Sequence, residues 1–424
     1  MVHYNTFSIG ANFISQNKKY FLRQNSTRHF IRTLILSFYR QFDKNTFVLF
    51  LISISLFAGC SIQSNYVKES YGVSVPTDSI KQTIYLIGDA GEPLVEKKEP
   101  VFRLLNNSAS VSPANSTIIF LGDNIYPSGL PDSGHSDREE MERRLNEQIN
   151  IGVESRTRTI FIPGNHDWDY KGRDGLAAIK RQEEFITQKN NSHISMLPKS
   201  GLPGPSVVDI DDEVRIIAID TEWWLHKYQK PFYQNDSNEV QTQHRFLDSL
   251  SGILAGSQQR KIIVVGHHPL RTFGEHGGFF DWKDHLFPLR KLSNWLWIPL
   301  PGIGSLYPIS RIFGISDQDM SGRKNTLMRN AIDSVLSLYP VVVYASGHEH
   351  VLQVIEKESH HYYLVSGNGI QLHDEALTVA ASTIAASRNK GFMRLDFLKS
   401  GKIRLGVVVA EDNEGVEIFS MILK

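Results

Sequence analysis

Residues 117–126 read TIIFLGDNIY, an apolar run that stops at a glycine, a carboxylate and a phenol. The first five residues are apolar or β-branched, which is typical of a strand that is buried on both faces. Gly122 and Asp123 follow at once, so a turn and a charged side chain stand where the strand ends. This stretch predicts a strand of a parallel sheet whose carboxyl end carries polar side chains.

The same arrangement recurs four more times along the chain. The runs TIYLI, TIFIP, KIIVV and VVVYAS are followed by GDAG at 88–91, GNHD at 164–167, GHHP at 266–269 and GHEH at 347–350. In open α/β sheets the carboxyl ends of the strands meet along one crevice, so we expect these five loops to converge. Carboxylates, an amide, imidazoles and a phenol are the ligands that a pair of hard to borderline cations needs. The sequence therefore predicts a site for two metal ions.

The five motifs resemble those of the calcineurin-like metallophosphoesterases, and within that superfamily those of the purple acid phosphatases of the tartrate-resistant type. The resemblance implies an α/β fold of two packed mixed β-sheets flanked by helices, a four-layer α/β/β/α sandwich. It also implies a ligand set, in which Asp123 bridges the two ions: Asp89, Tyr126 and His350 for one metal, and Asn165, His267 and His348 for the other. A phenolate favours Fe(III), so the expected cofactors are Fe(III) with Fe(II), Zn or Mn.

Two further histidines are candidates for catalysis. Two cations clamp a phosphate ester and lower the pKa of a bound water, after which the leaving oxygen needs a proton. His166 of GNHD is the first candidate donor, because it is not itself a predicted ligand. His276, in the string GEHG, resembles a substrate-contacting histidine of the tartrate-resistant enzymes and is the second. Asp167 and His268 are expected to support this set as neighbours of the ligands.

Each residue also has a plainer interpretation. His267 and the histidine after it are suited to a surface pair, and Asp89 is suited to cap a helix that starts near residue 93. Tyr126 is suited to pack in a turn, and His276 to lie in a glycine-rich surface loop. The common placement of all five motifs after apolar runs favours the metal site.

Strand and helix patterns alternate up to about residue 190, with helices expected at 137–150 and 175–188. This alternation is typical of βαβ units on a parallel sheet. Later segments, such as VRIIAID, YYLVSG and IRLGVVVAE, are rich in strand residues and predict a second, mixed sheet. Residues 279–320 are rich in aromatics, Pro and Gly and predict an insertion. It would cap the metals, pack against its own domain, or touch a bilayer.

The first 59 residues carry an export pattern. Residues 1–46 hold seven Lys or Arg and one acid, and residues 47–59 form an apolar run that is too short to span a membrane. The string LFAGC resembles a bacterial lipobox, which implies lipidation of Cys60; an ordinary signal peptide or short anchor is the alternative. We therefore expect a leader and signal peptide at 1–59, a flexible tether at 60–80 and the metallophosphoesterase domain at 81–424. The expected location is the bacterial cell envelope, facing the periplasm.

The charge balance and the cysteine content limit the classes of binding partner that we expect. The chain has 45 Lys or Arg against 45 Asp or Glu, and after residue 59 the acids outnumber the bases by six, which disfavours nucleic acid. Its single cysteine excludes a disulfide framework. We expect hydrolysis of small phosphate monoesters, with the membrane as partner through Cys60. The alternatives are a phosphodiesterase or nucleotidase with the same centre, and an envelope binding or assembly protein that uses the insertion at 279–320.

Overall fold

The computed structural model describes residues 61–62, 64–72, 78–257, 259–293, 295–357, 361–370, 374–411 and 414–423. The expected leader, the signal peptide and Cys60 lie outside these residues. The described chain divides into two compact units, one formed by Trp282–Leu306 and the other, the main unit, by the remainder. Among the described helices, none combines the length and the apolar character that a membrane crossing requires.

One sheet of the main unit has seven strands in the order β15-β14-β13-β2-β3-β4-β5. The strands β2 to β5 pair in parallel, and β13 to β15 add an antiparallel half. Their bounds are β2 Ile80–Ile87, β3 Ser116–Phe120, β4 Arg158–Phe161, β5 Ile194–Met196, β13 Gly391–Leu398, β14 Ile403–Glu411 and β15 Glu414–Leu423.

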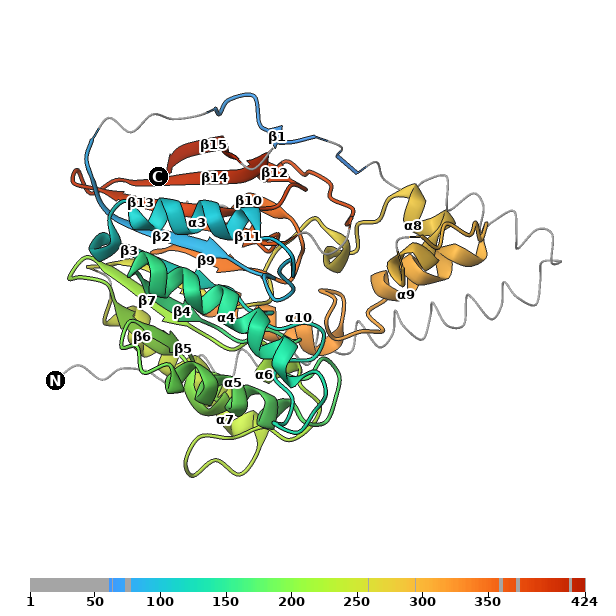
Figure 1. The fold of residues 1–424 in the computed structure, drawn as a ribbon, viewed down its shortest axis with the longest axis horizontal. Helices are drawn as coiled ribbons and strands as arrows, with labels where there is room; N and C mark the ends of the chain where they lie inside the picture. The colour runs from blue at the N-terminus through green and yellow to red at the C-terminus, as the bar shows by residue number, and fades with distance from the viewer. Residues whose placement is uncertain are drawn as a thin grey trace. The chain divides into compact units, whose positions relative to one another are not determined.

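The crossovers between the parallel strands of this sheet hold the helices α3 (Pro100–Ser110), α4 (Arg138–Ser155) and α5 (Gly175–Gln188). Figure 1 shows these three helices across one face of the sheet. The predicted helices at 137–150 and 175–188 are confirmed as α4 and α5, with α4 running five residues further. It ends where Arg156 turns into the left-handed conformation at φ 55°.

The second sheet has eight strands in the order β1-β12-β10-β11-β9-β8-β7-β6, and it is mixed, as predicted. The bounds are β1 Tyr66–Val67, β6 Ser206–Asp209, β7 Val214–Ala218, β8 Lys261–Val265, β9 Val341–Ser346, β10 Leu352–Lys357, β11 His361–Ser366 and β12 Thr383–Ser387. The helices α6 (Glu222–Leu225), α7 (Glu239–Ala255) and α10 (Arg323–Leu336) flank it and contact one another.

Alternate residues of the strands explain how the layers stack. Ile84 of β2 and Ile119 of β3 share one core cluster with Ile216 of β7, so the two sheets pack face to face. Residues in the intervening positions, such as Phe120 and Phe161, point to the opposite face, where these two rings stack at 4.7 Å. Apolar residues on both faces need a helix layer outside each sheet. The predicted four-layer α/β/β/α architecture is confirmed.

Part of the segment that we expected to be a tether lies along the second sheet. β1 pairs antiparallel with β12, and the backbone N–H of Ile62 donates to the carbonyl of Leu377 at 2.8 Å. The polar composition that suggested a tether is compatible with an edge strand, because the backbone supplies the pairing and the side chains need not be buried.

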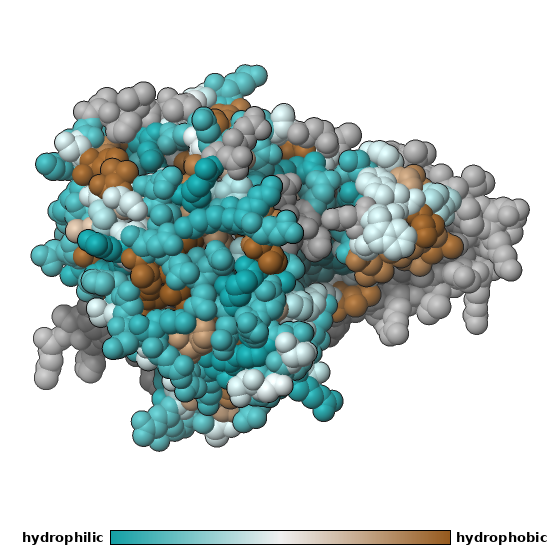
Figure 2. Space-filling model, in the orientation of Figure 1, coloured by the Kyte–Doolittle hydropathy of each residue, from teal (hydrophilic) through white to brown (hydrophobic). Residues whose placement is uncertain are grey.

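The unit Trp282–Leu306 is the central part of the predicted insertion. It contains α8 (Trp282–Leu286) and two short 3-10 turns, Pro288–Lys291 and Ile303–Ser305. Arg290 forms an ion pair with Asp284 at 2.7 Å and lies over the ring of Trp297, while Trp295 is 77% exposed. Figure 2 shows apolar side chains gathered on its surface. The cap, packing and bilayer roles stay predictions.

Candidate metal centre

Three of the predicted ligands follow their strands in a backbone conformation that residues other than glycine rarely adopt. Asp89 after β2 has φ 56°, Asp123 after β3 has φ 53°, and His348 after β9 has φ 69°. Gly122 has φ 93°, and a Cβ there would lie 2.5 Å from Nδ1 of His267. Such strain persists only where the surroundings impose it, and it gathers at functional sites.

The first group of ligands surrounds the hydroxyl of Tyr126. That oxygen lies 3.1 Å from Oδ1 of Asp89, 3.2 Å from Oδ2 of Asp123 and 3.1 Å from Nε2 of His350. Nε2 of His350 is also 3.5 Å from Oδ1 of Asp89. Metal–ligand bonds of about 2.1 Å at right angles place neighbouring donor atoms about 3 Å apart, so this spacing fits one shared cation.

The second group surrounds the amide oxygen of Asn165. Its Oδ1 lies 2.9 Å from Nε2 of His267 and 3.0 Å from Nδ1 of His348. Nε2 of His267 is 3.4 Å from Oδ1 of Asp123. The Asp123 carboxylate therefore offers one oxygen to each group, which is the geometry of a bridging ligand.

The charges of the two groups also call for cations. Asp89 and Asp123 are 1% and 2% exposed, and their only ion-pair partners in the described chain are histidines. Burying a carboxylate without a full positive charge nearby is costly. The structure thus brings all seven predicted ligands together in an arrangement that fits two metal ions.

Each histidine ligand has its second ring nitrogen near an oxygen, in hydrogen-bond geometry for His267 and His348 and at ion-pair distance for His350. An N–H that donates to this oxygen leaves the lone pair of the other nitrogen directed at the centre. The pairs are Nδ1 of His267 with the carbonyl of Leu121 at 2.8 Å, Nε2 of His348 with the carbonyl of Gln318 at 3.0 Å, and Nδ1 of His350 with Oε1 of Glu375 at 3.2 Å.

Burial and opposite charges shift the pKa values in this cluster. Burial acts to raise the pKa of Asp123, but the charges of His267 and His166 outweigh it and hold that pKa below its usual value. Burial acts to lower the pKa of His267, but the charge of Asp123 raises it to about 10. The pKa of Tyr126 is well above its usual value, first through burial and then through Asp89 and Asp123. The phenol therefore keeps its proton unless a cation displaces it.

His166 lies beside the centre without joining either group of ligands. Its Nδ1 is 2.6 Å from the carbonyl of Pro127, its backbone N–H donates to Oδ1 of Asp123, and its ring stacks on Tyr170 at 4.2 Å. Nε2 lies 4.0 Å from Oδ2 of Asp123. With Nδ1 directed at the Pro127 carbonyl, Nε2 is the nitrogen that is left to face a substrate.

His276 also reaches the edge of the centre, with its ring centroid 4.0 Å from that of His348. Its Nδ1 lies 3.0 Å from Oδ1 of Asp319 and 2.9 Å from Nη2 of Arg311. Oε1 of Glu349 accepts its backbone N–H at 2.5 Å. Burial lowers the pKa of His276 first, and the charge of Arg311 lowers it further. These contacts hold the ring in place, unlike those of a free surface loop.

Two of the plainer interpretations are wrong. His267 and His268 are fully buried, so they are no surface pair. The helix α3 begins only at Pro100, with Glu99 before it, so Asp89 caps no helix. His268 lies with His267 and a third histidine in one cluster, but its ring nitrogens are each 2.8 Å from other partners, Oγ1 of Thr221 and Oε1 of Gln318. We therefore assign it to the support of the centre.

Asp167 ties two motif loops together. Its carboxylate accepts backbone N–H groups from Asn124 at 3.0 Å and Gly164 at 2.8 Å, and the side-chain amide of Asn124 at 2.9 Å. The expected supporting role fits these contacts. Sequence reasoning missed four further residues that hold the histidines, because they lie outside the motifs: Arg311, Gln318, Asp319 and Glu375.

The sequence model of the calcineurin-like phosphoesterase family matches residues 83–352, which include all seven predicted ligands. No curated protein matches the chain. Among solved structures, GAP50, described as the anchor in the inner membrane complex of Plasmodium, matches at a TM-score of 0.51 and 13% identity, covering 80% of this chain and 89% of its own. The purple acid phosphatase PPD1 from yellow lupin matches at 0.49 and 13%, covering 81% and 54%. A dimetal phosphatase from Danio rerio matches at 0.44 and 12%, covering 82% and 99%.

At such identities the GAP50 match shows a shared fold alone. The family match spans more than half of the chain and its whole candidate centre, so the protein belongs to the calcineurin-like phosphoesterases, a family of phosphoric ester hydrolases.

Proposed function

We propose that the protein hydrolyses small phosphate monoesters at a two-metal centre. The observation that carries this proposal is the Asp123 carboxylate, which lies between two groups of donor atoms and offers one oxygen to each. Cations at a spacing of about 3.5–4 Å neutralise the ester and make a water nucleophilic near neutral pH. Asp89, Tyr126 and His350 would hold one ion, and Asn165, His267 and His348 the other, with Asp123 shared.

The chain's own residues then manage the proton and the orientation of the ester. His166 donates a proton from Nε2 to the leaving oxygen, while the Pro127 carbonyl fixes its other nitrogen. His276 contacts the phosphate oxygens, and its ring is oriented by Asp319 and Arg311. Both imidazoles lie at the edge of the centre, where a bound ester would meet them.

The phenol of Tyr126 supports Fe(III) in the first group, with Fe(II), Zn or Mn in the second. The test is metal analysis and a visible absorption spectrum of the protein, together with turnover of 4-nitrophenyl phosphate. An iron–phenolate band should be present and should disappear in Tyr126→Phe. Tyr85→Phe is the matched control, because that hydroxyl donates to the carbonyl of Ser108, away from the ligand groups. Two bound metals without the absorption band would contradict the assignment of iron but would leave the hydrolase proposal intact.

The His166→Ala variant tests the acid. It should keep both metals and lose about 10²–10⁴-fold in kcat, which is what a general acid contributes. A protein that binds no metal and hydrolyses no ester would contradict the proposal as a whole. Turnover of bis(4-nitrophenyl) phosphate at least as fast as that of the monoester would favour the phosphodiesterase alternative.

We further propose that the protein is exported and anchored through Cys60 in the bacterial envelope, on the strength of the LFAGC string and the apolar run before it. Mass spectrometry of the mature N-terminus should find a lipidated Cys60, and Cys60→Ser should abolish the modification. The rival is a binding or anchoring protein. It is favoured by the shared fold with GAP50, which is described as an anchor, and by the exposed Trp295. Membrane association that depends on residues 282–306, without ester hydrolysis, would support that rival.

A further inference from the structure

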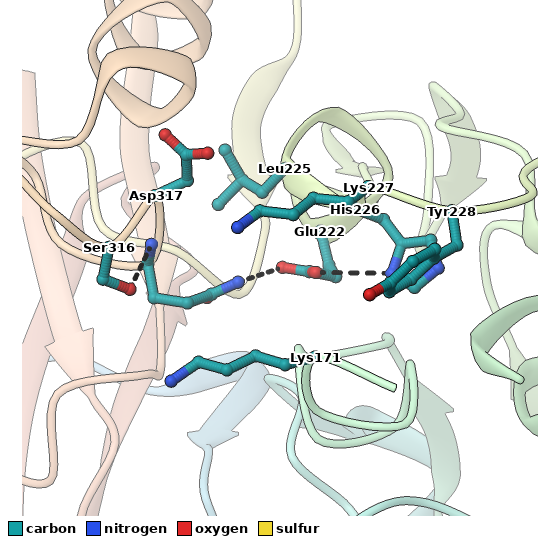
Figure 3. A pocket seen from close by; sticks show the side chains of 9 residues that line it. Lys171, Glu222, Leu225, His226, Lys227, Tyr228, Ser316 and Asp317 are labelled. Atoms are coloured by element: carbon teal, nitrogen blue, oxygen red, sulfur yellow. Dashed lines mark hydrogen bonds and ion pairs between the residues drawn. The ribbon is translucent and has the colours of Figure 1, made fainter. Parts of the chain in front are cut away.

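The main unit contains a small pocket that the proposed chemistry does not use. Lys171, Glu222, Lys227, Asp317 and Gln318 are among the residues that line it, and its volume is about 30 Å³ (Figure 3). One water needs about 10–15 Å³ of such space. The pocket therefore has room for two or three waters or one compact oxyanion.

Two walls of the pocket are continuous with the metal centre. The backbone carbonyl of Gln318 accepts the N–H of Nε2 of His348 at 3.0 Å, so the residue that lines the pocket also orients a predicted ligand. Lys171 directly follows Tyr170, whose ring stacks on His166 at 4.2 Å. The pocket thus lies next to both the second group of ligands and the candidate acid.

Two ammonium groups of the pocket have no carboxylate partner in the described part of the chain. Lys171 lies 4.6 Å from the ring of Tyr170, and neither it nor Lys227 forms an ion pair with any described residue. Figure 3 shows the side chains of Lys171 and Lys227 among those that line the pocket.

The carboxylates of the pocket are already engaged. Oε2 of Glu222 accepts the side-chain amide of Gln318 at 2.9 Å, and Oδ1 of Asp317 accepts the backbone N–H of Lys324 at 3.1 Å. The ammonium groups of Lys230 and Lys324 both donate to the carbonyl of His226, another lining residue, at 3.1 and 3.3 Å. The charged groups that line the pocket are thus two carboxylates, which accept hydrogen bonds, and two ammonium groups, which have no such partner in the described chain.

The backbone fixes the position of Lys171. This residue has φ 68°, a left-handed conformation that lysine rarely adopts, and Asp169 before it has φ 60°. The turn is closed by the N–H of Gly172, which donates to the carbonyl of Asp169 at 2.6 Å, while Oδ2 of Asp169 accepts the N–H of Asp174 at 3.0 Å. Strained residues of this kind persist where the surrounding structure holds them. The backbone of Lys171 is therefore held by a turn that follows the GNHD loop, while its side chain is exposed.

From these contacts we infer that the pocket binds a second anionic group of the substrate, a carboxylate or phosphate attached close to the scissile ester. The inference rests on the proposed function, because the ester itself would be held at the two-metal centre. Lys171 and Lys227 supply the attraction, because neither ammonium group is paired with a carboxylate of the described chain. Charge complementarity of this sort selects among substrates more than it adds raw affinity. The preferred substrates are compact esters with two anionic groups.

The test compares phenyl phosphate with its 3-carboxy and 4-carboxy derivatives, which differ from it by one carboxylate. For the wild-type protein, kcat/KM should be roughly two- to fivefold higher for the better carboxy ester, mainly through a lower KM, as expected for an ion pair with exposed lysines. In Lys171→Gln and in Lys227→Gln this ratio should fall toward one. Lys180→Gln, an exposed lysine on α5, is the matched control and should keep the wild-type ratio. A wild-type ratio of one, or a ratio that the two variants do not change, would overturn the inference.

The outcomes separate the two proposals. If all three esters are hydrolysed and the variants do not change the ratio, the anion-binding role of the pocket is refuted and the hydrolase proposal stands. If none of the esters is hydrolysed, the hydrolase proposal itself is contradicted. Calorimetric titration of the full chain, without added metal, with inorganic phosphate then tests the pocket by itself. Binding should be lost in the Lys171→Gln/Lys227→Gln double variant and retained in Lys180→Gln. Equal binding by the wild type and the double variant would show that the lysines hold no anion.

Discussion

Replacing Gly91 with alanine should disable the metal centre without touching any ligand. Gly91 belongs to the GDAG loop, and its carbonyl accepts the backbone N–H of Tyr126 at 3.2 Å. A Cβ at this position would lie 2.6 Å from the backbone of both Asn124 and Ile125, and 2.7 Å from the carbonyl of Asp123. All three neighbours are backbone atoms, so no side chain can rotate away to make room.

The size of the effect follows from these distances. Cβ atoms essentially never approach other atoms more closely than 3.0 Å, so the contact must open from 2.6 Å by at least 0.4 Å. Metal sites tolerate about 0.2 Å in their bond lengths. The loop that carries Asp123 and Tyr126 would therefore move by about twice that tolerance. A misplacement of 1 Å can cost about 100-fold in rate, so we expect a loss of about tenfold or more in kcat, with about 1–3 kcal/mol of stability lost to overpacking.

The assay combines metal content, kcat for 4-nitrophenyl phosphate and chemical denaturation. The matched control is Gly252→Ala on α7, where a new Cβ meets nothing within 4 Å. That variant should keep the metals and the activity and gain about 0.5–1 kcal/mol, because alanine is the better helix former. If Gly91→Ala kept wild-type metal content and kcat, then the tight packing of GDAG against GDNIY would not position the ligands, and the reasoning would be refuted.

Three more predictions concern other parts of the main unit. Glu375→Gln should weaken metal binding about 10–100-fold in a competition assay with a chelator. The reason is that Oε1 of Glu375 lies 3.2 Å from Nδ1 of His350, and Oε2 accepts the backbone N–H of His350. An unchanged metal affinity would mean that these contacts do not orient the ring. Asp220→Asn should flatten the pH dependence of stability. Burial raises the pKa of Asp220 to about 8 from 3.8, so the folded state keeps a proton that the unfolded state releases, and the free energy of unfolding falls as pH rises between these values, by up to about 1.4 kcal/mol per pH unit. Denaturation curves at pH 5 and 7.5 measure this, and an equal slope in both proteins would contradict it. Asn238→Ala should cost about 1 kcal/mol in denaturant melts without changing kcat, because its side chain accepts the N–H of Gln241 at the start of α7.

The sequence was sufficient to predict the strands that precede the motif loops and to name the candidate ligands. Each ligand motif is a local signal, in which an apolar run gives the strand and the glycine and polar residues that follow give the loop at its carboxyl end. Asp123 shows this well, since TIIFL and GDNIY together placed it at a strand end, and the structure finds it between the two ligand groups. The resemblance to a known family then supplied the division of the ligands between two ions.

Other features depend on segments that meet only in the folded chain. Trp223 and Trp224 of α6 are at most 5% exposed, and Trp224 packs edge-on against Phe246 of α7. The strand β1 could not be foreseen either, because an edge strand of two residues has no periodicity and depends on the free edge of β12.

What the sequence determined by itself is therefore the chemistry of the centre: which donor atoms are present and at which strand ends they stand. Only the tertiary structure decided how those donors are oriented. Glu375 holds His350 from 25 residues away, the Gln318 carbonyl holds His348 from 30, and Lys171 and Lys227 line one pocket from two separate loops. Short motifs reveal the candidate ligands because a strand and the loop that follows it are adjacent in the sequence. Orientation depends on hydrogen bonds between distant segments, and these exist only once the two sheets have packed and brought their loops together.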